Sequence, residues 1–271
     1  MPDERIASVP VTRVVGQRTV DGDDVIVIEE PLEIRAAWHN GEEPREKSIS
    51  VTMRTPGDDS DLAAGFLFTE GLLHAAEDVE GVRHWSSPNV IRVSLRKGAR
   101  FDTSKLDRHF YTTSSCGVCG KTSIDALRVA ISARPRMSRP ITSELIHRLP
   151  GILEEHQAAF RQTGALHAAA VFDASGTLLR SREDIGRHNA VDKAIGSLFL
   201  ERKTPLSDTI LMVSSRASFE IVQKAVVAGI PAVASVGAPS TLAVDLAREF
   251  GVTLLGFVRD GRFNVYAGDV G

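Results

Sequence analysis

Cysteine is scarce in this sequence. Among 271 residues there are only two cysteines, Cys116 and Cys119, which share the run TTSSCGVCGKTS. Two cysteines cannot form a disulfide framework, so a disulfide-rich secreted fold is excluded. Because both belong to a single C-x-x-C motif flanked by glycines, any thiol chemistry of this chain takes place at that motif.

The chain also lacks an excess of positive charge and any long apolar run. Its 32 Lys and Arg against 35 Asp and Glu leave a net charge of −3, which removes the simplest electrostatic case for nucleic-acid binding. The longest weakly polar stretch, residues 225–238, is too short to cross a membrane and contains Gly229 and Pro231. The N-terminal run MPDERIASVP has no apolar segment typical of a secretory signal. We therefore expect a cytoplasmic protein with no nucleic-acid or membrane partner.

The pattern of the first part predicts strands. With 42% hydrophobic residues, the chain has enough apolar material for one large domain or two smaller ones. A single helix is predicted in TPGDDSDLAAGFLFTEGLL, where Asp58 and the residues after it offer an N-cap and an acidic first turn. Short β-rich runs surround it: VPVTRVV, DVIVIEE, PLEIRAAW, SISVTMR, GVRHW and NVIRVSL. We therefore predict a β-rich N-terminal domain over residues 1–111.

After this domain, residues 112–140 are expected to form the cysteine loop, a short helix over 123–130 and a linker. A helix follows from Thr142, and Pro150 and Gly151 are expected to break or kink it. Strands and helices then alternate, which favours a largely parallel sheet covered by helices. The prediction is an α/β (α+β) chain whose second domain, over residues 141–271, is a three-layer α/β domain. On its helix ASFEIVQKAVVAG, Glu220 and Lys224 are spaced for an ion pair.

Three interpretations of Cys116 and Cys119 remain open. A structural zinc site needs two more ligands, and the histidines that would supply them stand at irregular spacings. A dithiol redox pair uses the same C-x-x-C spacing, but thioredoxin-like sites place it between an early strand and a helix. A persulfide carrier needs a nucleophilic thiolate with freedom to reach two partners, which the flanking glycines favour.

Two strand-to-helix turns are predicted to bind an anion. Free N–H groups and hydroxyls at such turns face phosphates at the carboxyl ends of strands. The first turn carries Ser214, Ser215, Arg216 and Ser218, and the second carries Gly237, Pro239 and Ser240. Arg259 and Arg262 lie in the nearby run FVRDGR. Together they indicate a phosphorylated ligand.

Two histidines are further candidates. In GRHNAVDK, His188 and Asn189 stand beside a glycine turn at the start of a helix, which makes them candidate ligand-binding residues. In GALHAAAVF, His167 resembles the start of a zinc deaminase site, H-x-E followed by P-C-x-x-C. Ala169 stands where the glutamate would be, and Ser218 and Ile221 fall near the thiol positions. The fold is therefore expected to be cytidine-deaminase-like without the deaminase chemistry.

Six blocks resemble the formate dehydrogenase accessory sulfurtransferase family (FdhD/NarQ), in the family's order. They extend from about Val25 to Ala267 and are more specific than the C-x-x-C alone. The blocks are RTPGDDSDLAAGFLFTEGLL, SSCGVCGKTSID, TGALHAAAVFD, DIGRHNAVDK, SSRASFEIVQKAVVAGIP and GFVRDGRFNVY.

The resemblance implies a carrier that takes sulfur as a cysteine persulfide from a cysteine desulfurase. It would pass this sulfur to the molybdenum (or tungsten) bis(guanine dinucleotide) pterin cofactor of formate dehydrogenase. It implies the persulfide on Cys116 with Cys119 as helper, and a homodimer. Because the chain has two cysteines and no spaced histidine pair, we expect no zinc. The cofactor-binding stretch implied by the family is Phe257, Val258, Arg259, Asp260, Gly261 and Arg262. The alternatives are a pterin-binding chaperone that handles no sulfur, and a zinc- or redox-regulated binding protein.

Overall fold

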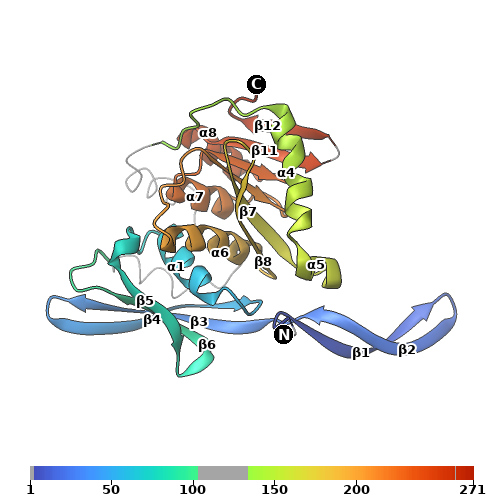
Figure 1. The fold of residues 1–271 in the computed structure, drawn as a ribbon, viewed down its shortest axis with the longest axis horizontal. Helices are drawn as coiled ribbons and strands as arrows, with labels where there is room; N and C mark the ends of the chain where they lie inside the picture. Colours follow the sequence, from blue (N-terminus) through green and yellow to red (C-terminus); the bar gives the residue numbers. More distant parts are fainter. Residues whose placement is uncertain (1–2, 103–133, 260) are drawn as a thin grey trace.

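The computed structural model describes residues 3–102, 134–259 and 261–271 of the chain. Cys116, Cys119, Asp260, the predicted helix over 123–130 and the first predicted domain boundary lie outside the described residues. The division predicted at residues 140 and 141 stays a prediction. Figure 1 shows a helix-covered sheet above a second, smaller sheet, from which a two-stranded hairpin extends.

The N-terminal part consists of strands, as predicted. β1 (Ile6–Val15) and β2 (Arg18–Val27) form the antiparallel hairpin. A separate sheet has the order β4-β3-β6-β5, and the predicted strand DVIVIEE is divided between β2 and β3. In β3, alternate residues such as Leu32 and Ile34 are buried on one face of the sheet. The strands of the sheet are β3 (Glu30–Asn40), β4 (Glu43–Arg54), β5 (Val79–Trp85) and β6 (Ser87–Leu95).

α1 (Asp59–Thr69) covers the inner face of this sheet, and the short 3-10 helix η1 (Ala76–Asp78) precedes β5. Asp58 stands at the N-cap position of α1 in the left-handed conformation, and its side chain makes no capping hydrogen bond. Asp59 is held by the buried guanidinium of Arg54, whose Nε and Nη2 donate at 3.1 and 3.0 Å. The acidic start of the helix therefore anchors α1 to the end of β4.

The C-terminal part is a six-stranded sheet with the order β12-β11-β10-β9-β7-β8. β9, β10 and β11 are parallel, whereas the β11–β12, β7–β9 and β7–β8 pairings are antiparallel. The prediction of a largely parallel sheet is therefore wrong for the outer strands, because β7–β8 and β11–β12 follow one another directly, without a crossover helix. The strands are β7 (His167–Asp173), β8 (Leu178–Asp184), β9 (Thr209–Val213), β10 (Ala232–Ser235), β11 (Thr253–Arg259) and β12 (Arg262–Ala267).

Helices cover both faces of the six-stranded sheet (Figure 1). Alternate residues of each strand enter two different apolar clusters, as for Ala169 and Ala170 of β7. One cluster includes α6 (Arg187–Leu200), α7 (Phe219–Ala228) and α8 (Thr241–Phe250), and the other includes α4 (Ser143–Glu155). The short α5 (Ala158–Thr163) follows α4. This three-layer arrangement, after a β-rich N-terminal part, confirms the predicted fold class.

α4 is not broken at Pro150, although a break is one of the two outcomes expected from the sequence. It continues through this proline to Glu155, although a proline inside a helix typically costs about 3 kcal/mol. Leu145, Ile146 and Leu149 on the preceding turns are buried against the sheet, and so is Leu153 beyond the proline. Burial of a leucine contributes about 1.5–3 kcal/mol, so this apolar stripe outweighs the local penalty.

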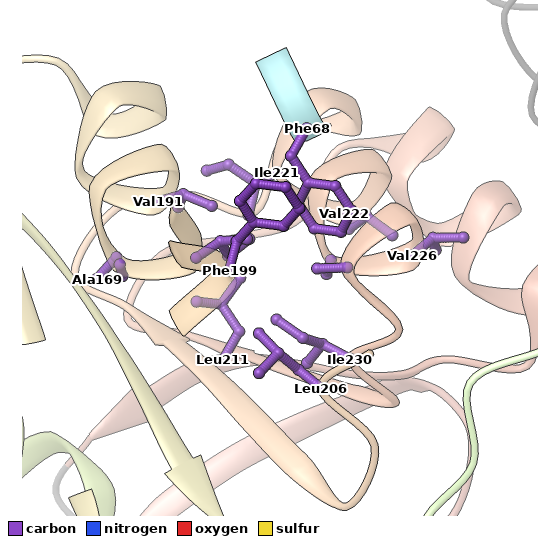
Figure 2. Close-up of a cluster of buried hydrophobic side chains, with 14 of the residues drawn as sticks. Phe68, Ala169, Val191, Phe199, Leu206, Leu211, Ile221, Val222, Val226 and Ile230 are labelled. Atoms are coloured by element: carbon purple, nitrogen blue, oxygen red, sulfur yellow. The ribbon is translucent and has the colours of Figure 1, made fainter. Parts of the chain in front are cut away.

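The two parts of the molecule meet where α1 crosses α6. The backbones touch because glycines face each other: a Cβ on Gly65 would lie 2.0 Å from the carbonyl oxygen of Asp192, and one on Gly196 would lie 2.0 Å from that of Asp61. Beside this crossing, Phe68 of α1 stacks on Phe199 of α6 with ring centroids 4.5 Å apart, and Figure 2 shows both among buried residues of α7 and β9. One apolar cluster therefore extends from the small sheet to the large one.

Replacement of Gly196 by alanine should destabilise the chain strongly. The new methyl group cannot be accommodated without separating α1 from α6, and overpacking of this kind costs about 1–3 kcal/mol or more. The same substitution at Gly151, whose Cβ would meet nothing within 4 Å in α4, should be neutral or stabilising by up to about 1 kcal/mol. Urea unfolding of both variants measures the difference. Equal stabilities would contradict the crossing.

Candidate functional site

The carboxyl ends of the three parallel strands lie side by side at one edge of the large sheet. After β9, the carbonyl of Ser215 accepts a hydrogen bond from Gly237 N, which follows β10, at 3.1 Å. The carbonyl of Gly237 in turn accepts from Phe257 N of β11 at 3.1 Å. The structure therefore brings together the predicted anion-binding turns and the start of the FVRDGR stretch. In open α/β sheets this edge is the usual ligand-binding position.

Arg216 is the exposed side chain of the first turn. It packs against Gly237, where a Cβ would lie 2.9 Å from the Arg216 Cγ. The two serines before it hold the edge itself: Ser214 Oγ accepts from Ala168 N at 2.9 Å, and Ser215 Oγ donates to the Arg216 carbonyl at 3.0 Å. Among Ser214, Ser215 and Arg216, only the side chain of Arg216 is exposed at this edge.

The second turn is tied to the first. Ser240 N donates to the carbonyl of Ala217, and Ser240 Oγ accepts from Ala243 N as the cap of α8. Gly251 ends α8 in the left-handed conformation. The hydroxyl of Ser240 therefore caps α8, and it is the backbone of the turn that lies at the edge of the sheet.

The described part of the FVRDGR stretch comprises the end of β11, residues 257–259, and the start of β12 at Arg262. Arg259 and Arg262 are paired across the two strands, and both side chains are exposed. Phe257 adopts the left-handed conformation at φ 55°, whereas Val258 points into the apolar cluster under α4. The two arginines are thus available to a ligand, and Val258 contributes to the packing of the strand.

The first turns of α6 and α7 also meet at this edge of the sheet. His188 Nε2 lies 3.3 Å from Ser218 Oγ, at the N-cap of α7, and 3.8 Å from Glu220 Oε2. His188, rather than His167, is therefore the histidine that faces Ser218. Burial lowers the pKa of His188 to about 4, and the cations Lys224 and Arg187 add to this effect. At neutral pH the imidazole is uncharged, so it can both donate and accept a hydrogen bond.

Below His188, a buried ion cluster joins α7 to α1 and α6. Lys224 Nζ lies 2.9 Å from Glu70 Oε1, 3.0 Å from Thr69 Oγ1 and 3.0 Å from Asp192 Oδ2. The predicted Glu220–Lys224 pair is replaced by these contacts, because the lysine side chain points into the interface. Burial alone would lower the pKa of Lys224, but the carboxylates of Asp192 and Glu70 raise it above its ordinary value.

Asn189 links α6 to the small sheet. Its Nδ2 donates to the Met53 carbonyl at 2.7 Å and to Asp184 Oδ1 at 3.0 Å, and its Oδ1 accepts from Thr52 at 3.2 Å. Lys193, one turn later, is also buried and bonds the Thr55 carbonyl and Asp184 at 2.8 Å. The amide of Asn189 is therefore occupied within the chain, and its predicted ligand role has no support from this geometry.

Within the described residues, neither a metal-ligand cluster nor either of the two hollows named below lies at this edge of the sheet. Residues 3–102, 134–259 and 261–271 contain no cluster of three His, Cys, Asp or Glu side chains that could hold a metal. One hollow of about 430 Å³ is lined by Arg139, Asp173 and Lys203, and another of about 430 Å³ by Trp38 and Arg92 on the small sheet. Among the helices described, none has the length and apolar character to cross a bilayer.

Comparison with known proteins identifies the family. Residues 27–270 match the model of the FdhD/NarQ family. The chain belongs to this family. The sulfur carrier protein FdhD of Streptomyces coelicolor is 49% identical over 257 residues, covering 90% of this chain and 88% of the relative. That of Mycolicibacterium paratuberculosis is 45% identical over 265 residues, covering 94% of each.

A solved structure shares the fold. It is described as a candidate formate dehydrogenase accessory protein from Desulfotalea psychrophila, and it superposes with a TM-score of 0.75 over 97% of both chains at 23% identity. The family membership confirms the resemblance inferred from the six blocks. The roles of Cys116 and Cys119 and of the arginines at the edge stay predictions.

The protonation of His188 provides a test of the site's electrostatics. Histidine-labelled NMR should show this ring titrating near pH 4. Arg187→Gln should raise the midpoint, because it removes a cation, and Glu220→Gln should lower it, because it removes a carboxylate. Since the folded chain binds this proton less readily than the unfolded chain, His188 costs stability as the pH falls below 6.5. A midpoint near 6.5, or shifts of the same sign, would contradict the geometry.

Proposed function

We propose that this chain is a sulfur carrier that serves the maturation of formate dehydrogenase. The observation that carries the proposal is the family match over residues 27–270, which includes both cysteines of the chain. The relatives from Streptomyces and Mycolicibacterium are named sulfur carrier proteins. The function is thus assigned through the family and the C-x-x-C motif together.

Loading requires one nucleophilic step at Cys116. The Cys116 thiolate attacks the terminal sulfur of a persulfide on a cysteine desulfurase, and a new S–S bond forms as the old one breaks. The desulfurase cysteine leaves as a thiolate, so no external oxidant or reductant is needed. Cys119 is assigned the role of helper, and no zinc takes part.

The acceptor of the sulfur is proposed to bind at the edge of the large sheet. A molybdenum or tungsten bis(guanine dinucleotide) cofactor carries diphosphates, and here it is a substrate. Exposed Arg216, Arg259 and Arg262, together with the backbone of the adjoining turns, supply the donors that diphosphates need. The neutral ring of His188, which faces Ser218 of the first turn, is proposed to supply a further polar contact.

Two alternatives are a pterin-binding chaperone that handles no sulfur, and a zinc- or redox-regulated binding protein. The carrier proposal places the chain in the cytoplasm, with a cysteine desulfurase and formate dehydrogenase as partners. Only the carrier requires sulfur to be bound covalently on the chain. Detection of that sulfur therefore separates it from both alternatives.

Replacement of Cys116 should abolish sulfur acceptance. After incubation with a cysteine desulfurase and cysteine, mass spectrometry under non-reducing conditions should find one added sulfur on the wild-type chain and none on Cys116→Ala. The matched Cys119→Ala variant should still accept sulfur but transfer it less well. Normal formate dehydrogenase activity with Cys116→Ala would overturn the carrier assignment.

The arginines at the edge should determine nucleotide affinity. Loss of one charge-assisted contact costs about 1.5–3 kcal/mol, so Arg262→Ala should weaken guanosine diphosphate binding about tenfold or more. Adenosine diphosphate should bind more weakly than guanosine diphosphate to the wild type, because a guanine-shaped site rejects the exchanged edge groups. Arg45→Ala, at an exposed position on the small sheet, is the control and should bind normally. Calorimetry that finds unchanged affinity for Arg262→Ala would remove this edge from the proposal.

A further inference from the structure

One side of β12 faces the second turn of the candidate site. β12 is the last strand of the large sheet and pairs with β11 (Figure 1). In this antiparallel pair Asn264 lies opposite Gly256, so both residues point to the same side. A Cβ on Gly256 would lie 2.9 Å from Pro239 Cδ and 3.3 Å from the carbonyl oxygen of Gly237. The Asn264 side chain therefore lies on the side of the sheet that carries the second turn.

The two arginines of the FVRDGR stretch point to the same side as Asn264. Arg262 and Asn264 are two residues apart in β12, and alternate residues of a strand share one side. Arg259 is paired with Arg262, and its neighbour Val258 points the other way, into the apolar cluster under α4. Asn264 is therefore the next side chain after the two cations, about 7 Å farther along the strand.

The amide of Asn264 is held by Tyr266, which is itself fixed. Tyr266 is the following residue on this side, and its ring lies over Gly256, where a Cβ would be 2.9 Å from Tyr266 Cε2. The ring is half-buried against the apolar cluster that includes α8, and Arg248 donates to the Tyr266 carbonyl at 3.3 Å. Asn264 Nδ2 donates to the Tyr266 hydroxyl at 3.4 Å. The amide therefore has a fixed neighbour that limits its orientation.

Asn264 has hydrogen-bonding groups left for a ligand. The side chain is exposed, and within the described residues its Oδ1 atom and its second N–H group have no hydrogen-bond partner. Asparagine is also disfavoured in strands, and neither packing nor the bond to Tyr266 accounts for an amide with two free groups at this position. Asn264 therefore presents one acceptor and one donor, side by side, next to two guanidinium groups.

We propose that Asn264 binds the base of the nucleotide and determines the preference for guanine, with Tyr266 as a positioning residue. The inference rests on the proposed function, in which Arg259 and Arg262 bind a diphosphate. The ribose separates the diphosphate from the base, as one strand step separates Arg262 from Asn264. Guanine presents an acceptor, O6, beside a donor, N1–H, and the amide carries the complementary pair. Adenine presents these groups in the opposite order, so the amide would have to turn over and lose the bond that Nδ2 donates to Tyr266.

Calorimetry with guanosine diphosphate, adenosine diphosphate and inorganic pyrophosphate separates the contacts of the base from those of the diphosphate. Asn264→Ala should weaken guanosine diphosphate binding about threefold to tenfold, as expected for the loss of a hydrogen bond between uncharged groups. Its affinities for adenosine diphosphate and pyrophosphate should stay as in the wild type, so the preference for guanine falls. Arg262→Ala should weaken the binding of all three ligands. Asn40→Ala, at the exposed end of β3, is the matched control and should bind all three normally.

Tyr266→Phe tests the positioning role, because it removes only the hydroxyl that Asn264 contacts. The amide can then turn over, so the preference for guanosine over adenosine diphosphate should fall while pyrophosphate binding stays unchanged. An unchanged preference in Asn264→Ala, or an equal loss of pyrophosphate binding, would overturn the inference. If binding depends on Arg262 but not on Asn264, only this inference fails. If the wild type binds none of the three ligands, the proposed acceptor site fails with it, whereas sulfur loading on Cys116 would leave the carrier assignment standing.

Discussion

The crossing of α1 and α6 at two glycines is the contact on which the rest of the structure depends. Because neither Gly65 nor Gly196 has a side chain, the helix backbones touch and the small sheet is held against the large one. The contact fixes the distance between the helices but leaves sliding along their axes unspecified. Buried lysines supply that specificity: Lys224 reaches Glu70 and Asp192, and Lys193, paired with Asp184, donates to the Thr55 carbonyl. Each charge is costly to bury without its partner, so only one register satisfies them all.

This register also fixes the candidate site. Asp192 and His188 are four residues apart on α6, and Lys224 and Glu220 are four residues apart on α7, so each pair lies on one side of its helix. The ion cluster therefore fixes the position of α7 along α6, so that His188 lies beside Ser218 and Glu220. Burial lowers the pKa of His188 most, and the same lysine adds to this effect. Contacts made with the N-terminal part thus contribute both to the position and to the charge state of a group at the sheet edge.

Features with local causes could be predicted from the sequence, and features with distant causes could not. The start of α8 at Ser240 and its end at Gly251 follow from capping chemistry within a few residues. The alternation of strands and helices, which is also a local signal, predicted the layered architecture. The inward turn of Lys224 and the hydrogen bonds of Asn189 depend on Glu70, Met53 and Thr52, more than 130 residues earlier. Helical spacing alone predicted an ion pair between Glu220 and Lys224. The continuation of α4 through Pro150 also has a distant cause, because it depends on burial against strands that follow in the sequence.

An acidic chain can still present a site for an anionic ligand, because charge acts locally in salt solution. At physiological ionic strength, charges are screened beyond about 8 Å, so a ligand at the sheet edge senses Arg216, Arg259 and Arg262 rather than the net charge of −3. These arginines come from two segments that the ends of parallel strands bring together. A diffuse basic surface would attract any polyanion, including nucleic acid. Under the proposed function, three exposed arginines at one edge of the sheet would instead suit a ligand whose charge is concentrated in a diphosphate.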